Sequence, residues 1–392
     1  QASSNFYRGN PAATEVRDAQ YFSSSKTLLF TATRDKTVLG GQLTAPYELF
    51  RTNVDTGRQY KIPVPVTGGF GVDKIEKVPG KNKLVFKLRL SNGQTELWIY
   101  NLSTNALSKI SQPPVANALG VREFRISPSG NHLVFVGEMD YFGKFELYSV
   151  AISDSDGYSA PRKISGLMNG PGIKSCNTCW GDKQFQFDIS PGGTNAYVIY
   201  SAYQSSSSNA DLHIATIDGS AIPFATIHST SYSNLPSGSK ISAAETYGIG
   251  SFAESFVFTP NGSHVAYFAH DATAATSNQE TIYLTSISYS GSNLNVTFPT
   301  QLSNLAESPY FIAGKSSERI IFLEKKPSLP NYTTSVKKWT PSSSNILFDI
   351  TTGFPHQLGD LTLENSDNEL LGVVIDRSSP GVIRAVNVWS GS

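Results

Sequence analysis

The sequence predicts an all-β protein built from repeated four-stranded antiparallel sheets. The main observation is a recurring phrase of the form Phe-x-(Phe/Ile)-(Ser/Thr)-Pro-x-Gly, and each clear copy is followed by a second run of alternating apolar residues. No stretch of the chain shows a convincing amphipathic helix. The three clear copies of the phrase lie within residues 124–135, 185–198 and 256–267. A strand–turn–strand unit that recurs at wide spacing indicates a repeat architecture.

Each repeat can be divided into four predicted strands. The first strand alternates, as in Phe185, Phe187 and Ile189, so that one face packs on a neighbouring sheet. The Pro-x-Gly segment supplies the fixed φ and the positive φ of a tight hairpin turn. The second strand is almost entirely apolar, and a third follows at 145–150, 211–217 and 281–287. Fourth strands are predicted at Tyr60 to Ile62 and at 106–110, 161–164, 222–227, 298–302 and 346–350.

Weaker copies on both sides bring the count to seven. They lie at 19–31 and 72–86 upstream, and at 308–322 and 360–374 downstream. Seven units along the chain average about 56 residues each, which is close to the blade length of propeller repeats. We therefore predict a single domain over residues 1–392, a seven-bladed β-propeller, with repeats near 16–62, 72–111, 121–165, 183–228, 252–303, 307–351 and 358–391.

The seventh unit has no fourth strand in the sequence, which would leave an open sheet edge of a kind that proteins rarely tolerate. The segment that precedes the first repeat is expected to close it, through Ser4, Asn5, Phe6, Tyr7 and Arg8. Two closures are open. The segment pairs with the seventh sheet of its own molecule, or it is donated to another copy and links identical subunits head to tail.

The repeat motif resembles the TolB-type propeller repeat, in which a Ser-Pro-Asp-Gly turn joins two strands and an Ile-Tyr strand follows. The resemblance is carried by the three central copies, where Ser129, Gly192 and Asn261 stand in place of the usual Asp. It implies the propeller fold. Similar propellers occur in periplasmic TolB, in prolyl oligopeptidase-like enzymes and in oligogalacturonate lyases, so the resemblance does not assign a function.

Composition excludes some partners. The chain of 392 residues has 31 basic and 31 acidic side chains, and charged residues make up only 16% of it. With no net charge, the protein has no electrostatic field that would attract nucleic acid or an acidic membrane. No run of about eighteen apolar residues is present that could span a bilayer.

Several features favour a secreted glycoprotein. Cys176 and Cys179 form a lone Cys-x-x-Cys, which lacks the second pair of a structural zinc site and is expected to be a local disulfide. Four Asn-x-Ser/Thr sequons lie beside predicted turns or strand ends, at Asn101, Asn261, Asn295 and Asn331. The chain opens at Gln1 without an initiator Met, as a mature secreted protein would. We therefore expect an extracellular location.

The sequence contains few candidates for catalytic or metal-binding residues. No Gly-x-Ser-x-Gly nucleophile elbow occurs, and no catalytic residue or cofactor is predicted. The resemblance to oligogalacturonate lyases keeps open a metal site formed by His213, His270 and His356, against the alternative of surface and turn histidines. The run Asp154 to Tyr158 could wrap calcium, although a solvated hairpin tip fits it better.

Other polar and aromatic residues are interpreted as exposed charges, packing residues or recognition residues. Glu138 and Asp140 are expected to be exposed charges at a strand end. The tyrosines on the third strands, Tyr100, Tyr148 and Tyr283, are expected to pack between sheets. Aromatic residues in loops could instead line a binding face; they are Tyr141, Phe142, Tyr203 and Tyr232.

Two functions are consistent with these observations. In the first, the protein is a secreted, non-catalytic propeller whose partner is a protein or a glycan, including a second copy of itself. In the second, it is an extracellular polysaccharide lyase or glycosidase with its site at the central channel. A glycosidase needs two carboxylates about 5–10 Å apart, and the order of residues along the chain does not place them.

Overall fold

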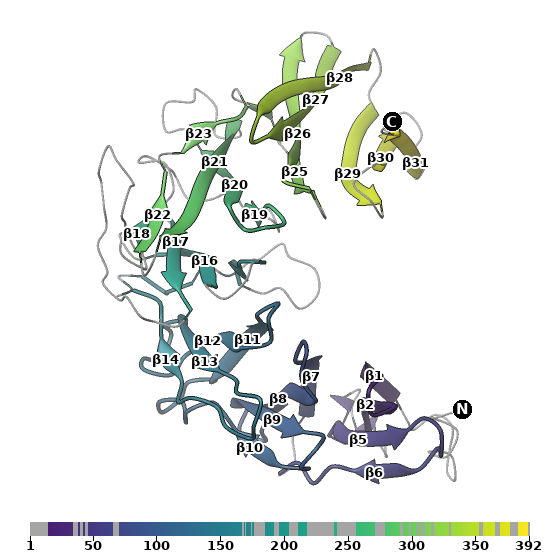
Figure 1. The fold of residues 1–392 in the computed structure, drawn as a ribbon, viewed down its shortest axis with the longest axis vertical. Coiled ribbons are helices and arrows are strands. Elements are labelled where there is room, and N and C mark those ends of the chain that lie inside the picture. Colours follow the sequence, from purple (N-terminus) through teal and green to yellow (C-terminus); the bar gives the residue numbers. More distant parts are fainter. Residues whose placement is uncertain are drawn as a thin grey trace. The chain divides into compact units, whose positions relative to one another are not determined.

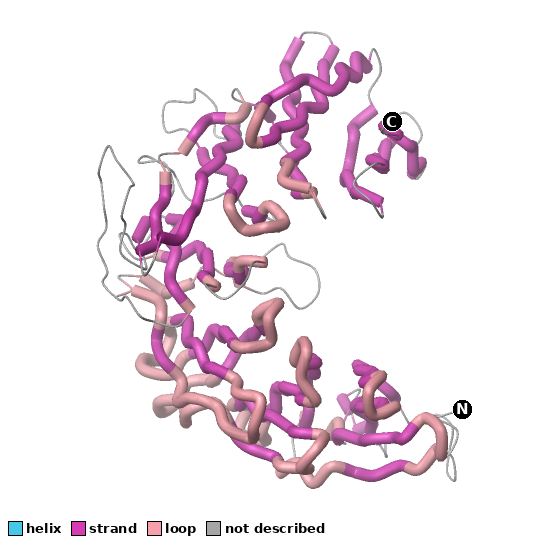
Figure 2. The backbone as a smooth tube through the Cα atoms, viewed as in Figure 1, coloured by secondary structure: helices cyan, strands magenta, loops and turns pink. Residues whose placement is uncertain are grey.

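The computed structural model of the chain is all-β in the part that it describes (Figures 1 and 2). Contacts divide the chain into two compact units, residues 1–163 and residues 164–392. The residues described are 15–33, 38–39, 42–43, 46–65, 70–166, 168, 170–173, 175, 185–191, 196–203, 211–217, 239–240, 256–270, 279–290, 293–297, 299–303, 306–307, 310–314, 317–328, 331–352, 356–364, 369–376 and 383–390.

The first unit contains three four-stranded antiparallel sheets and one short hairpin. Sheet 1 has the order β1-β2-β5-β6, sheet 2 the order β10-β9-β8-β7 and sheet 3 the order β11-β12-β13-β14. The strands are β1 (Glu15–Phe22), β2 (Thr27–Thr33), β5 (Glu48–Asn53), β6 (Gln59–Lys61), β7 (Gly71–Lys77), β8 (Lys83–Arg89), β9 (Thr95–Asn101), β10 (Leu107–Lys109), β11 (Val121–Ile126), β12 (His132–Gly137), β13 (Glu146–Ala151) and β14 (Arg162–Lys163), with β3 (Val38–Leu39) and β4 (Gln42–Leu43) in the hairpin.

The second unit continues the same strand–turn–strand pattern through four sheets. Sheet 4 has the order β15-β16-β17-β18, sheet 5 is built around β19-β20-β21, sheet 6 has the order β25-β26-β27-β28 and sheet 7 has the order β29-β30-β31. The strands are β15 (Phe187–Ile189), β16 (Tyr197–Ala202), β17 (Asp211–Thr216), β18 (Ser239–Lys240), β19 (Phe256–Phe258), β20 (His264–His270), β21 (Gln279–Ser290), β22 (Asn293–Val296), β23 (Thr300–Gln301), β24 (Ala306–Glu307), β25 (Tyr310–Ala313), β26 (Ile320–Ser328), β27 (Asn331–Thr340), β28 (Ser343–Thr352), β29 (His356–Glu364), β30 (Glu369–Asp376) and β31 (Ile383–Ser390).

These sheets confirm the predicted fold class. The described part of the chain is all-β, and consecutive strands of a repeat are neighbours in antiparallel sheets. Five of the repeats form four-stranded sheets, whereas sheet 5 has six strands and sheet 7 has three among the described residues. Residues 4–8, predicted to supply its fourth strand, lie outside the described residues. The single-domain prediction remains a prediction.

The fourth position of sheet 4 holds a strand that the sequence analysis does not predict. The fourth position of sheet 4 was expected at 222–227, which lies outside the described residues. In the structure this position is held by β18, where Ser239 pairs with Ile214 and Lys240 pairs with His213. Sequence pattern favoured the more apolar segment, but an outermost strand has one uncovered face and edge and can be short and polar.

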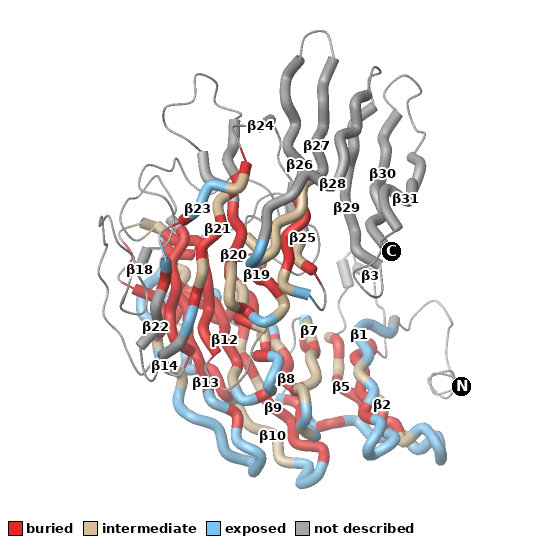
Figure 3. The backbone as a smooth tube through the Cα atoms, turned by 45° about the horizontal axis from the view of Figure 1, so that its top comes forward, coloured by how far each residue is buried: buried red, intermediate tan, exposed pale blue. Residues whose placement is uncertain are grey.

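The hydrophobic cores lie between consecutive sheets of each unit. One cluster joins sheets 2 and 3, through residues such as Val85, Leu97, Phe124 and Phe135. Others join sheets 1 and 2, sheets 4 and 5, and sheets 5 and 6. The second strands are the most buried, as β8 and β12 in Figure 3 show and as the fully buried β16 repeats, which confirms that the nearly all-apolar runs are covered on both faces. Burying one Leu or Phe side chain contributes about 1.5–3 kcal/mol.

The repeated hairpin has the same hydrogen bonds in different sheets. The Ser or Thr before the proline accepts the backbone N–H of the first residue of the second strand through its side-chain oxygen. The distance is 3.0 Å from His132 N to Ser127 Oγ and 3.1 Å from His264 N to Thr259 Oγ1. Ser190 repeats this contact with Tyr197 at 3.1 Å. The Ser/Thr-Pro-x-Gly phrase therefore encodes a closed turn.

The glycine of this turn also permits neighbouring sheets to approach. Gly130 has φ +69° and Gly262 has φ +77°, which favour glycine. A Cβ on Gly130 would lie 2.1 Å from the carbonyl oxygen of Pro79, in the preceding hairpin of sheet 2. At the other end of the sheets Gly120 has φ +77° and lies against Thr95, with which it forms a parallel bridge. The glycines thus mark where one sheet touches the backbone of the sheet before it.

We predict that Gly130→Ala destabilises the first unit much more than Gly80→Ala. Both glycines have φ +69°, but a Cβ on Gly80 would have nothing within 4 Å. Gly80→Ala is expected to cost about 1 kcal/mol from the positive φ alone, and Gly130→Ala a further 1–3 kcal/mol, roughly, from overpacking. Urea unfolding of the two variants measures the difference. Equal losses would contradict the role assigned to the contact with Pro79.

Candidate functional site: a loop face and the networks that hold it

The candidate binding face lies on the loops that join strands of the first unit. Three apolar side chains are exposed there: Leu119 (40%), Tyr141 (58%) and Phe142 (66%). Leu119 precedes β11, and Tyr141 and Phe142 lie between β12 and β13. We call these three residues the loop face. Large apolar side chains that remain exposed beside each other are characteristic of interaction sites.

A buried carboxylate joins the two loops that carry this face. Glu138 is 3% exposed, and its Oε2 accepts the backbone N–H of Leu119 at 3.0 Å while its Oε1 accepts that of Gly143 at 2.8 Å. Its own backbone N–H donates to the carbonyl of Gly120 at 3.1 Å. The prediction that Glu138 is an exposed strand-end charge is therefore wrong. A strand-end position does not reveal that two neighbouring loops turn their N–H groups toward it.

Charged side chains surround the exposed tyrosine. The ammonium of Lys144 lies 5.3 Å from the centroid of the Tyr141 ring and that of Lys163 lies 6.0 Å from it. Lys163 also forms ion pairs with Glu146 at 2.5 Å and with Asp140 at 3.4 Å. These contacts hold Tyr141 from one side, so that the loop face presents aromatic rings on a fixed backbone.

The third-strand tyrosines are packing residues, as predicted. Tyr100 and Tyr148 are each 3% exposed and belong to the cores between sheets. Tyr148 stacks on Phe135 and donates to Glu146 Oε2 at 3.1 Å; burial is the largest cause that raises its pKa, followed by the charge of Glu146. Tyr283 stacks on Tyr267. Of the loop aromatics, Tyr203 is partly buried and Tyr232 lies outside the described residues.

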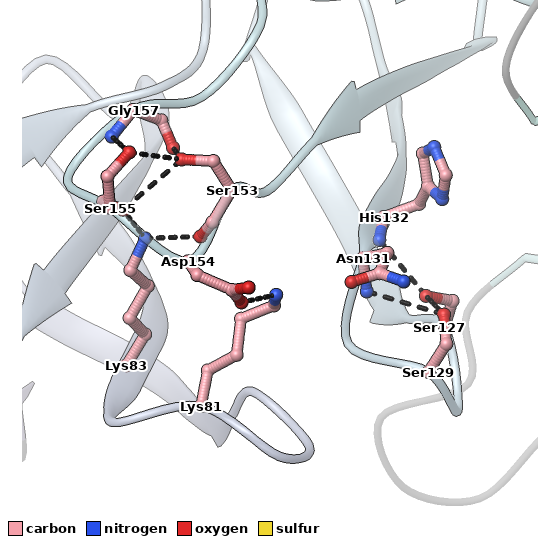
Figure 4. A network of polar contacts seen from close by, with 10 residues as sticks. All are labelled: Lys81, Lys83, Ser127, Ser129, Asn131, His132, Ser153, Asp154, Ser155 and Gly157. Atoms are coloured by element: carbon pink, nitrogen blue, oxygen red, sulfur yellow. Dashed lines mark hydrogen bonds and ion pairs between the residues drawn. The ribbon is translucent and has the colours of Figure 1, made fainter.

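A second polar network fastens sheet 3 to sheet 2 through the loop after β13 (Figure 4). The ammonium of Lys83, which is 2% exposed, donates to the carbonyl of Ser153 at 2.7 Å and to that of Ser155. Lys81 pairs with Asp154 in the same loop. Burial is the main effect on Lys83 and lowers its pKa, against the raising effect of Asp156. We call this loop with its lysines the clasp.

The contacts of the clasp bear on the hypothesis that the run Asp154 to Tyr158 binds calcium. Within the run 154–158 the carbonyl of Ser155 accepts a hydrogen bond from the Lys83 ammonium, which also donates to the carbonyl of Ser153 just before the run (Figure 4). The alternative of a solvated hairpin tip agrees with the structure, because residues 153–160 are exposed and the side chain of Asp154 is 93% exposed. Asp156 accepts from Asn101 Nδ2 at 2.5 Å and from Thr104 Oγ1 at 2.8 Å, and Tyr158 donates to the carbonyl of Lys109 at 2.8 Å.

In the second unit a comparable network surrounds His264. Its Nδ1 lies 2.7 Å from Ser263 Oγ and 3.7 Å from Glu318 Oε2, and its ring meets Trp339 edge-on at 4.7 Å between centroids. Ser263 Oγ donates to Glu318 Oε2 at 3.1 Å. The contacts of His264 with Ser263 Oγ and with Glu318 Oε2 both use Nδ1 of the imidazole. In a catalytic triad the two imidazole nitrogens contact different partners, the nucleophile on one side and the carboxylate on the other. We therefore interpret this cluster as a structural contact that holds the hairpin of sheet 5 against sheet 6.

Of the three predicted metal ligands, the structure describes only the side chain of His213. His213 is 1% exposed in β17, where it stacks on Tyr200 at 5.5 Å between ring centroids. The side chains of His270 and His356 are outside the described residues, although their backbones belong to β20 and β29. Within the described residues no group of three His, Cys, Asp or Glu could hold a metal ion. The histidine site remains a hypothesis.

The other predicted site residues fall into two groups. Asn101 and Asn261 are described: Asn101 is 8% exposed at the end of β9, and Asn261 is exposed at the turn before β20. Cys176, Cys179 and residues 4–8 lie outside the described residues, and of Asn295 and Asn331 the structure describes only the backbone. Among the described residues no helix has the length and hydropathy needed to cross a bilayer.

Comparisons with known proteins find similarity at the level of structure. No protein-family model matches the chain, and no curated protein matches it in sequence. Similar solved structures include TolB from Acinetobacter baumannii, at 15% identity and a TM-score of 0.33, with 73% of this chain and 54% of that chain covered. The β-propeller domain of the Trilobed protease from Pyrococcus furiosus has 10% identity and a TM-score of 0.38, with 97% and 100% covered.

Oligopeptidase B from Trypanosoma brucei is also similar, at 7% identity and a TM-score of 0.45, with 94% of this chain and 46% of that chain covered. The chain therefore spans about half the length of TolB and of oligopeptidase B. The four-stranded antiparallel sheets agree with the resemblance to TolB-type propellers seen in the repeat motif.

We predict that the double variant Tyr141→Ser/Phe142→Ser keeps the free energy of unfolding within about 0.5 kcal/mol, because both rings are more than half exposed. Glu138→Ala should instead cost roughly 1–3 kcal/mol, since it removes the buried carboxylate that accepts the backbone N–H groups of both loops. Urea unfolding separates the two. A large loss from the double variant would show that the rings stabilise the fold and are not kept for recognition.

We also predict a pH dependence from His264. Burial is the largest influence on this imidazole and lowers its pKa from the usual 6.5, although Glu318 acts in the opposite direction. The unfolded chain therefore binds a proton more readily than the folded one, so stability falls as the pH is lowered through about 6.5. His264→Gln should flatten that slope between about pH 7.5 and 5, whereas His132→Gln, at the equivalent position of sheet 3, serves as control. An unchanged slope in His264→Gln would contradict the assignment.

Proposed function

We propose that this protein is a secreted, glycosylated and non-catalytic β-propeller that acts as an extracellular binding or assembly protein. In the sharper form of the proposal, copies of the chain join by strand donation, with residues 4–8 of one molecule pairing with sheet 7 of another. The partner is then a second copy of the chain, and the loop face is the surface left for a further protein or glycan.

The observation that carries the proposal is the edge of sheet 7. Within the described part of the chain β31 pairs with β30 alone, whereas the other repeats each place a fourth strand in this position. An unpaired edge presents a row of N–H and C=O groups, and an added strand satisfies them in register. The donated segment Ser-Asn-Phe-Tyr-Arg contains two consecutive aromatic residues, Phe6 and Tyr7, of a type that is enriched in strands.

Two features support binding over chemistry. The buried carboxylates of sheet 3 are engaged in structural contacts: Glu123 with Arg125, Glu138 with two backbone N–H groups and Glu146 with Lys163. The exposed rings of the loop face lie on loops that Glu138 joins through backbone hydrogen bonds. A surface that is already ordered loses little conformational entropy when a partner binds, which favours recognition.

A synthetic peptide of residues 1–10 provides the test. Added in excess to the purified full chain, it should compete with the donated segment and shorten or abolish assemblies seen by electron microscopy and by light scattering. A peptide of the same composition in scrambled order is the matched control. In the chain itself, Phe6→Pro removes a backbone donor from the donated strand and should reduce assembly in the same way.

The outcome can also go against the proposal. If the untreated protein is monomeric at all concentrations, residues 4–8 close their own sheet or serve elsewhere, and strand donation is rejected. If assemblies form but neither the peptide nor Phe6→Pro weakens them, the subunits are joined by a different surface. Turnover of a pectin-like polysaccharide by the monomer would favour the lyase or glycosidase alternative.

A further inference from the structure

The two described sequons occupy opposite environments. Asn261 lies exposed at the tip of the hairpin between β19 and β20, whereas Asn101 is 8% exposed at the base of the clasp. N-linked glycosylation replaces one hydrogen of Asn Nδ2 with a sugar, so the fate of this nitrogen in the folded protein decides whether a glycan can be carried there.

The Asn101 nitrogen is used by the fold. Nδ2 donates to Asp156 Oδ1 at 2.5 Å, and Asn101 Oδ1 accepts the backbone N–H of Ser103 at 2.9 Å. Asp156 also accepts from Thr104 Oγ1, so the carboxylate closes over the sequon. A sugar on Nδ2 would replace one of its two hydrogens at a residue that is only 8% exposed, so it would crowd Asp156 and displace the clasp loop from sheet 2.

The Asn261 nitrogen is placed differently. The Oδ1 of Asn261 accepts the backbone N–H of Ser263 at 2.7 Å, and its own backbone N–H donates to Glu318 Oε1 at 2.7 Å. These contacts fix the turn through the oxygen and the main chain, while within the described residues Nδ2 of this exposed side chain makes no hydrogen bond. The turn is therefore compatible with a substituent on Nδ2.

From this contrast we infer that Asn261 carries an N-linked glycan in the native protein and that Asn101 does not. The inference rests on the proposed export of the chain and names the position that is modified. The co-reactant is a lipid-linked oligosaccharide pyrophosphate of the host. Its bond from the anomeric carbon to the pyrophosphate oxygen breaks, a new bond forms between that carbon and Nδ2, the amide proton passes to a base, and the lipid pyrophosphate leaves with the electron pair.

The glycan on Asn261 would stand on the hairpin that Glu318 and Trp339 hold between sheets 5 and 6. Transfer before the hairpin closes leaves the later contacts of the turn intact. The same transfer to Asn101 would prevent the clasp from forming, so that chains modified there lack the contacts between Asp156 and sheet 2. The folded protein should thus be enriched in chains that are unmodified at Asn101.

Peptide mapping of the secreted full chain tests this directly. The protein is expressed with a secretory leader in a eukaryotic host, and its N-glycans are released enzymatically in water labelled with oxygen-18, which marks each formerly glycosylated Asn as labelled Asp. We expect the label at Asn261 and none at Asn101. Asn261→Gln should lose one glycan step on a denaturing gel, whereas the matched variant Asn101→Gln should keep the wild-type glycan pattern.

Each other result has a defined meaning. Label at Asn101, or its absence at Asn261, overturns the inference. If Asn261 is bare but Asn295 or Asn331 is labelled, the choice of site is wrong while the proposed glycoprotein survives. If no asparagine is labelled in the secreted chain, the inference and the glycosylation in the proposed function both fail, and strand donation remains to be judged by the peptide experiment.

Discussion

The close approach of one sheet to the backbone of the preceding one, within the first unit, is the constraint on which the packing of that unit depends. Gly130 against Pro79 and Gly120 against Thr95 bring sheets 2 and 3 together at both ends. Between these two points Val85, Leu97, Phe124 and Phe135 meet and exclude water. A side chain at either glycine would hold the sheets apart, and the apolar burial that drives their packing would be reduced along the whole interface.

Polar groups at the ends of the sheets add hydrogen bonds and ion pairs to the packing that the glycines allow. Lys83 and Asp156 fasten the loop after β13 to sheet 2, Glu138 joins two loops at the start of sheet 3, and Glu318 holds the hairpin of Asn261. Each of these groups lies at the edge of an apolar interface, where an unpaired charge would be costly. Because the polar groups are satisfied by loops, the loops themselves become ordered, and this order makes exposed Tyr141 and Phe142 suitable for recognition.

Much of the fold could be predicted because it is local. The Ser/Thr-Pro-x-Gly phrase forms its turn from hydrogen bonds within six residues, as between Ser127 and His132, and the alternation of Phe185, Phe187 and Ile189 follows from the geometry of a strand. The predictions for individual residues are wrong where the contacting residue is distant in the sequence. Nothing near Glu138 indicates that Leu119 will donate to it, and nothing near Asn101 indicates that Asp156 will cover it. The short strand β18 is not predicted for a similar reason, since an outer strand is chosen by the edge it fits and its own hydrophobicity matters less.

The sequence by itself therefore determined the repeat, its hairpins, the apolar second strands and the tyrosines of the third strands, because each depends on the periodicity and turn chemistry of a few consecutive residues. Only the tertiary structure decided which polar groups are buried, which loops are joined, and that the cation in the Ser153–Ser155 loop is the ammonium of Lys83. Most of these choices depend on contacts between residues that are far apart in the chain, such as Asn101 with Asp156 and Asn261 with Glu318. No local pattern records which of two distant groups will meet.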